Sequence, residues 1–165
     1  MTDMRYFRLI VLLSILYLIQ TVIISRFAAF GVKADILLVV TTMFAVNFGA
    51  EKGFIVGFLG GIIQDLFGVS YFFHSMTRAI LGFLVGTFKE SIVGSEEGIA
   101  FTSVIVATVA NFMIELLFFF FFFGKPVASP LILLETLFVS CIYNALFVPV
   151  LYPLIKWSSA RLVRE

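Results

Sequence analysis

The chain has 165 residues, of which 62% are hydrophobic and 13% charged, with a net charge of +1 and a mean hydropathy of +1.16. A soluble domain averages roughly 45–50% apolar and about 25% charged residues, so this chain has too few polar groups to cover its apolar surface in water. The near-zero net charge excludes an electrostatic surface for nucleic acid, and the single cysteine, Cys141, excludes an intrachain disulfide. Composition therefore predicts an all-α polytopic membrane protein that is solvated by lipid.

The apolar stretches predict about six transmembrane helices in one transmembrane domain, residues 1–165. A helix that crosses the hydrocarbon core needs about 20 residues, and short loops favour antiparallel neighbours along the chain. The second and third stretches are shorter than this, so five spans are the alternative. The predicted spans are residues 7–25, 36–50, 53–67, 72–88, 99–123 and 131–155.

The basic residues predict the orientation of these spans. With six spans, seven of the 11 Lys and Arg residues fall on the side of the two termini. Cytoplasmic loops carry an excess of Lys and Arg, so both termini are expected in the cytoplasm. The seven are Arg5, Arg8, Lys52, Lys89, Lys156, Arg161 and Arg164; on the other side are Arg26, Lys33, Arg78 and Lys125.

Small residues follow one face of the third and fourth predicted spans. The rows consist of Gly53, Gly57, Gly61 and Asp65 on the third span, and of Gly82 and Gly86 on the fourth. At 3.6 residues per turn, positions four apart lie on one helix face, and glycines there let another helix backbone approach closely. Two interpretations stay open: the rows pack the two helices against each other, or at least one of them binds the helix of a partner protein.

Charged residues of the same region predict a polar contact inside the membrane. Asp65 and Arg78 are expected at similar depth on consecutive helices, and intramembrane charges tend to be paired or to face a polar interior. We expect an Asp65–Arg78 ion pair, with a contact to another subunit or a polar cavity as alternatives. His74 is the only histidine and no Cys/His cluster surrounds it, so no metal site is predicted.

Two polar rows mark the fifth and sixth predicted spans, and because the spans are consecutive, we expect these rows to face each other and to share hydrogen bonds. They comprise Thr108, Asn111 and Glu115 on the fifth span, and Thr136, Ser140 and Asn144 on the sixth. Glu115 is the deepest carboxylate, and three states remain open for it: neutral, paired with a basic group, or facing water. A proton relay is its alternative functional interpretation.

Motifs typical of catalysis are absent from the sequence. It contains no nucleophile elbow, no HExxH motif and no phosphate-binding loop. A membrane enzyme is expected to gather reactive groups near one interface. We therefore predict a protein that is not an enzyme, with no catalytic residue and no cofactor.

Several segments together resemble the rod shape-determining protein family MreD. They are Lys33-Ala34-Asp35-Ile36-Leu37-Leu38, the row from Gly53 to Gly61 with Gln64-Asp65-Leu66-Phe67-Gly68, and the pair Gly82 and Gly86. Chain length and the layout of the spans are similar too, whereas Ala34 stands where the family usually has proline. The resemblance implies a non-enzymatic scaffold of the cell-elongation machinery in the bacterial cytoplasmic (inner) membrane. It also implies an MreC-like single-span partner, and a RodA-type glycosyltransferase and its transpeptidase within a larger complex that supports peptidoglycan synthesis.

A second interpretation belongs to another class of protein. The vitamin-binding subunits of energy-coupling-factor transporters are also bundles of about six short helices, to which MreD-like folds are thought to be similar. A small-molecule-binding subunit of this kind needs a pocket with convergent polar groups. Asp65, Arg78, Asn111 and Glu115 are candidates to supply some of these groups, and Asn144 is a further polar residue within the membrane.

Overall fold

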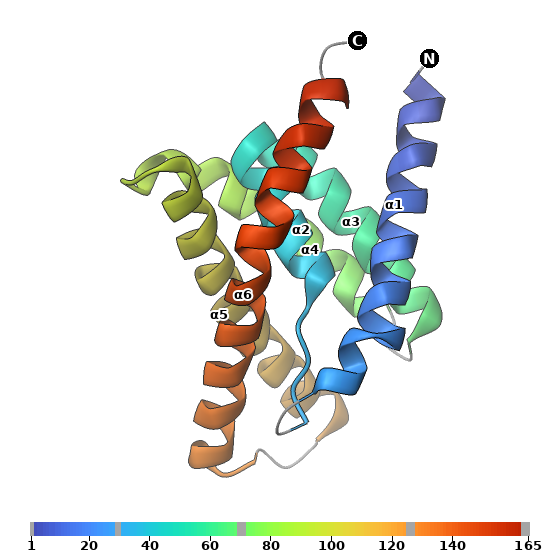
Figure 1. Ribbon diagram of the computed structural model, residues 1–165. Coiled ribbons are helices and arrows are strands. Elements are labelled where there is room, and N and C mark those ends of the chain that lie inside the picture. Colours follow the sequence, from blue (N-terminus) through green and yellow to red (C-terminus); the bar gives the residue numbers. More distant parts are fainter. Residues whose placement is uncertain (1, 29–30, 69–71, 125–127, 163–165) are drawn as a thin grey trace.

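The computed structural model describes residues 2–28, 31–68, 72–124 and 128–162, and these residues form α-helices, short 3₁₀ turns and connections, without a strand (Figure 1). The all-α architecture predicted from composition is confirmed. The helices are α1 (Thr2–Val22), α2 (Ile36–Phe48), α3 (Ala50–Phe67), α4 (Phe73–Phe88), α5 (Glu96–Phe123) and α6 (Pro130–Leu162).

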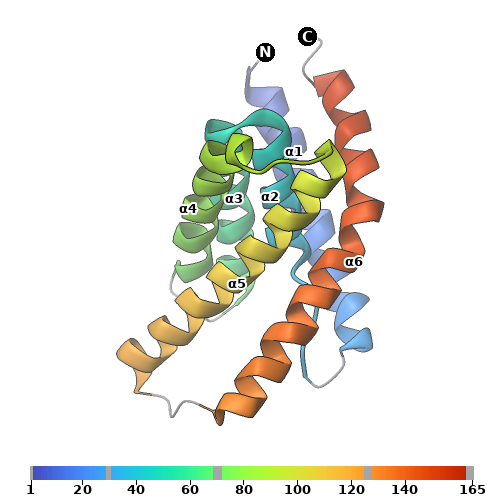
Figure 2. The same cartoon turned by 90° about the vertical axis from the view of Figure 1, so that its left-hand side faces the viewer.

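Successive helices run in opposite directions, so that the two chain ends lie at the same end of the molecule (Figures 1 and 2). We call this the terminal end; the α2–α3 and α4–α5 connections also lie there. Helices α1, α3 and α5 end toward the opposite end, which we call the distal end. Residues 31–35 lead from the distal end to the start of α2, which lies well inside the bundle (Figure 1).

Helix α2 occupies the centre of the bundle. Ten of its 13 residues are buried, and it contacts each of the other five α-helices. Its sequence is apolar on all sides, which is the pattern of a helix surrounded by others. The main apolar core accordingly gathers around Leu37, Val40 and Met43 of this helix.

Length and composition separate the helices into two groups. Three helices, α1, α5 and α6, are long and apolar enough to cross a membrane. This supports a membrane protein. Helices α2, α3 and α4 have 13, 18 and 16 residues. At 1.5 Å per residue α2 is about 20 Å long, shorter than a hydrocarbon core of about 30 Å.

A single glycine separates the second and third helices. Gly49 has φ 86°, a left-handed conformation that non-glycine residues rarely adopt, and it ends α2 directly before α3 begins at Ala50. The sequence predicts a break at Glu51-Lys52 instead. Both residues lie in the first turn of α3, where Glu51 interacts favourably with the helix dipole.

The glycine rows of α3 and α4 face each other within the chain. A Cβ added at Gly53 would overlap the carbonyl of Gly82, one at Gly57 the carbonyl of Arg78, and one at Gly61 the backbone of Ser75. A Cβ at Gly86 would likewise overlap the backbone of Ala50. Both rows are therefore occupied by packing inside one chain, and neither is a surface open to the helix of a partner.

Candidate functional site: a polar cavity in the distal half

Polar side chains from five helices converge on a cavity of about 260 Å³. It lies in the distal half of the bundle, between the α1–α2 connection, the distal parts of α3 and α4, and the facing sides of α5 and α6. We call it the polar cavity. Its lining residues are Gln20, Lys33, Ala34, Asp35, Leu38, Gln64, His74, Thr108, Asn111, Phe112, Glu115, Ser140 and Asn144.

Asp35 and Arg78 form the ion pair of this region. Nη2 of Arg78 lies 2.6 Å from both Oδ1 and Oδ2 of Asp35, and the Arg78 side chain is 0% exposed. The predicted Asp65–Arg78 pair is therefore wrong. Asp35 stands at the start of α2, beside which the close packing of α3 and α4 buries Arg78, whereas the carboxylate of Asp65 is turned toward the start of α4.

Asp35 also connects three helices. Its Oδ1 accepts a hydrogen bond from Leu38 N (3.1 Å), which caps the N-terminus of α2. Its own backbone N–H donates to Oδ1 of Asn144 on α6 (2.7 Å). The Asn144 amide in turn donates to Oγ1 of Thr108 on α5 (2.9 Å). One carboxylate and one amide thus hold α2, α4, α5 and α6 around the polar cavity.

Asp65 is satisfied by the first turn of α4. Its carboxylate accepts hydrogen bonds from the backbone N–H groups of His74 (3.2 Å) and Ser75 (2.8 Å), from the Ser75 hydroxyl and from Nδ1 of His74 (2.9 Å). An ionised carboxylate only accepts hydrogen bonds, so Nδ1 carries the proton. This fixes the orientation of the imidazole, whose Nε2 points toward α5.

Glu115 meets this imidazole across the polar cavity. Its Oε1 lies 3.8 Å from Nε2 of His74 and accepts a hydrogen bond from Nδ2 of Asn111 (3.0 Å). The Glu115 side chain is 32% exposed and that of His74 14%. The structure thus places Glu115 at the polar cavity, partly exposed and beside a histidine.

The remaining predicted polar residues contribute unequally. The hydroxyls of Thr136 and Ser140 donate to carbonyls of α6 itself, so only Asn144 of that row bonds to the facing row of α5.

Sequence reasoning did not single out Gln20 and Gln64 as part of a site, and it used Asp35 only for the family resemblance. An Asp directly before an apolar run is a helix N-cap signal, which marks Asp35; no comparable signal marks the two glutamines.

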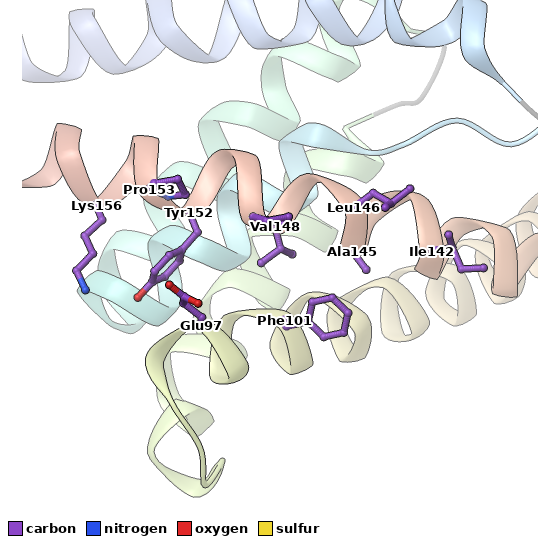
Figure 3. A pocket seen from close by; sticks show the side chains of 10 residues that line it. Glu97, Phe101, Ile142, Ala145, Leu146, Val148, Tyr152, Pro153 and Lys156 are labelled. Atoms are coloured by element: carbon purple, nitrogen blue, oxygen red, sulfur yellow. The ribbon is translucent and has the colours of Figure 1, made fainter.

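A larger hollow of about 690 Å³ lies between α5 and α6 near the terminal end (Figure 3). Side chains such as Phe101, Ile142 and Leu146 line it, and these are 44–60% exposed. Polar groups, among them Tyr152 and Lys156, gather at one end of it (Figure 3). The groove is open and mostly apolar, whereas a specific ligand site gathers convergent polar groups, so the polar cavity is the better candidate for specific recognition.

Fold and cavity together define a helical membrane protein with a polar cavity in one half. Among the described residues, no group of three or more His, Cys, Asp or Glu side chains could hold a metal ion. No family model matches the chain, and no solved structure matches it. The chain is similar to the UPF0397 protein PA0141 of Phytoplasma australiense, with 40% identity over 77 residues. These residues cover 43% of this chain and 40% of the phytoplasma protein, so the similarity spans less than half of either.

This similarity contradicts the resemblance to MreD, because UPF0397 is a different family. The expected role as a scaffold for cell elongation is wrong for the same reason. The physical cause of the error lies in the glycine rows. They are explained by the packing of α3 on α4 within one chain, and close-packed membrane helices of unrelated families use the same small-residue spacing. Nothing in the described residues tests the partners that the resemblance implied.

Proposed function

We propose that the protein is a small-molecule-binding membrane subunit of a transporter, comparable to the vitamin-binding subunits of energy-coupling-factor systems. The observation that carries the proposal is the polar cavity, to which five helices contribute hydrogen-bonding groups. Its volume of about 260 Å³ is close to the lower end of ligand pockets, about 300–1,000 Å³. The UPF0397 similarity also favours this class over the scaffold.

The cost of polar groups in a membrane supports a binding role. Uncompensated polar and charged groups are expensive at membrane depth, and where they occur they tend to mark substrate pathways. The polar cavity retains Glu115 and His74 with unused hydrogen-bonding capacity. A purely structural network would be expected to satisfy such groups by bonding them to each other. The proposed subunit is not an enzyme and needs no cofactor.

The orientation that we propose places both termini in the bacterial cytoplasm. The basic residues support it: Arg78, counted above with the outer side, is buried in an ion pair and is no loop charge, so the bias increases to seven against three. Lys125 and Arg164 are part of this count and lie outside the described residues. The polar cavity would then lie in the outer half, where a subunit for import would capture its ligand. A C-terminal alkaline phosphatase fusion is expected to be inactive, and an active fusion would reverse the orientation.

Binding itself is tested with the full-length protein in lipid nanodiscs. Native mass spectrometry is expected to detect a co-purified small molecule, or thermal unfolding is expected to shift upward with one of six probes: pyridoxamine, ethanolamine, pantothenate, biotin, nicotinamide and pyridoxine. The variant Ser140→Phe places a ring into the polar cavity and is expected to abolish binding. Ile142→Phe changes an exposed position of the same helix and serves as the control. Absence of any bound molecule and of any shift would overturn the proposal.

A further inference from the structure

We propose that the ligand of the polar cavity carries a positively charged nitrogen, which Glu115 and His74 bind from opposite sides. This inference rests on the proposed function and narrows it to a class of ligand. Its basis is that two hydrogen-bond acceptors, Oε1 of Glu115 and Nε2 of His74, face each other without a donor between them. The other acidic residue that lines the polar cavity, Asp35, is already neutralised by Arg78.

The two acceptors follow from the contacts of His74. Because Nδ1 donates to Asp65 at 2.9 Å, the neutral ring presents the lone pair of Nε2 on its other side. The atom opposite is Oε1 of Glu115, 3.8 Å away, which is too long for a hydrogen bond. A ligand N–H group that approached both atoms would donate to them and would replace the water that they otherwise need.

The charges around the polar cavity favour a cation. Asp35 is neutralised by Arg78, which binds both of its oxygens. Asp65 and Glu115 flank a single imidazole, so the three groups carry a net charge of −1 even when His74 is protonated, and −2 when it is neutral. A cationic ligand would supply compensating charge for these carboxylates, of which Asp65 is 3% and Glu115 32% exposed.

An aromatic side chain and the position of Lys33 agree with this class. Phe112 is part of the wall, one turn before Glu115 on α5, and aromatic rings attract cations through their π faces. Lys33 is a cationic side chain of the lining, but it is exposed, so its charge is screened more than that of a buried group and opposes a bound cation less. The amide of Asn111 already donates to Glu115 at 3.0 Å, which orients the carboxylate for a second donor.

The experiment compares the probes by charge in the nanodisc preparation. Dissociation constants are measured by isothermal titration for pyridoxamine and ethanolamine (cations, each with a protonated primary amine), pantothenate and biotin (anions), and nicotinamide and pyridoxine (neutral). At least one cation is expected to bind about tenfold or more tightly than any anion or neutral probe, as a charge-assisted hydrogen bond provides. Glu115→Gln keeps the size of the side chain and is expected to weaken that binding by about tenfold or more. Glu135→Gln removes the same charge from the exposed face of α6 and is expected to leave binding within about twofold.

The outcomes separate this inference from the function on which it rests. Binding of an anion or a neutral probe in preference to both cations would overturn the cation and leave the small-molecule subunit standing. Cation binding that Glu115→Gln does not weaken would overturn the assignment of Glu115. If no probe binds and no small molecule accompanies the purified protein, the proposed function fails together with the inference.

Discussion

Helices α2, α3 and α4, which we call the α2–α4 unit, and the α5–α6 pair are two parts of the bundle that are held together by different means. In the first, ten of the 13 residues of α2 are buried, and glycines bring the α3 and α4 backbones into direct contact. In the second, six of the 28 residues of α5 are buried, and three of these six are polar. Lipid is as apolar as a leucine side chain, so burial of apolar surface gives membrane helices little reason to associate. The α2–α4 unit thus relies on close backbone packing, whereas the α5–α6 pair shares a buried hydrogen bond between Asn144 and Thr108.

The polar cavity lies where these two halves meet. Asp35 and His74 reach it from the α2–α4 unit, and Asn111, Glu115 and Asn144 from the α5–α6 pair. The first side is fixed by the Asp35–Arg78 ion pair and by the hydrogen bonds of Asp65. The second side packs against it through apolar side chains such as Val104 and Val148, which share the core of α2, and through the hydrogen bond from the Asp35 N–H group to Asn144. Substitutions in the two halves should therefore differ in cost, and the following three variants test this in order of expected effect.

Asp35→Asn is expected to have the largest effect, a loss of about 3–5 kcal/mol in the free energy of unfolding. Asparagine can still cap α2, so the change isolates the loss of charge. It leaves the Arg78 guanidinium, which is 0% exposed, without a counter-ion, and its Nε and Nη1 atoms have no hydrogen-bond partner among the described residues. Unfolding titrations with SDS in mixed micelles measure the difference.

The double variant Asp35→Asn with Arg78→Met is the control for this prediction. It removes both charges together, so at least half of the lost stability should return, because no uncompensated charge stays buried. If the single variant were as stable as the unmodified protein, the ion pair would not be what fixes this side of the polar cavity.

Gly57→Ala is expected to cost about 1–3 kcal/mol, the usual range for overpacking. The new methyl group would overlap the Arg78 carbonyl and push α4 away from α3. Gly60→Ala is the matched control on the same helix, because there the nearest atom is Cδ2 of Leu37 at 3.9 Å, an ordinary contact. Alanine favours the helix by roughly 0.5–1 kcal/mol over glycine, so this control should unfold at the same or a slightly higher SDS fraction. Equal costs for both variants would contradict the close packing of α3 on α4.

The sequence alone predicts the helices, and it offers the close packing of the third on the fourth as one of two interpretations of the glycine rows, because both features depend on local spacing. Apolar stretches of nearly membrane length and glycines four residues apart are properties of one or two segments. The boundary at Gly49 was missed because the charges of Glu51 and Lys52 resemble a loop, whereas they fit into a first helical turn.

The polar cavity could be predicted only in part. Asn111, Glu115 and Asn144 stand out as polar residues in apolar helices, but the partner of Arg78 depends on how residues 43 positions apart meet. Spacing favoured Asp65 because it is close in the chain, and it gave no weight to Asp35 at the start of a central helix. Whether Glu115 meets His74 likewise depends on how α5 is oriented against α4, which no pattern within a single helix contains.

Asn144→Leu is expected to have the smallest of the three effects, about 1–2 kcal/mol. It removes the acceptor of the Asp35 N–H group and the donor to Thr108, and interhelical hydrogen bonds in membranes contribute about 0.6 kcal/mol on average and about 1.7 at most. Ser140→Ala is the control one turn earlier, since that hydroxyl donates within α6 and its loss should leave SDS unfolding unchanged.

Asn144 attaches α6 to both α5 and the start of α2, so its loss should loosen the seam between the halves while the α2–α4 unit stays intact. Hydrogen exchange of the Asn144→Leu variant in nanodiscs should therefore rise in α6 and in residues 31–35, with α3 and α4 unchanged. A rise spread equally over all helices would mean that the bundle unfolds as one unit, in which the two halves are not separable.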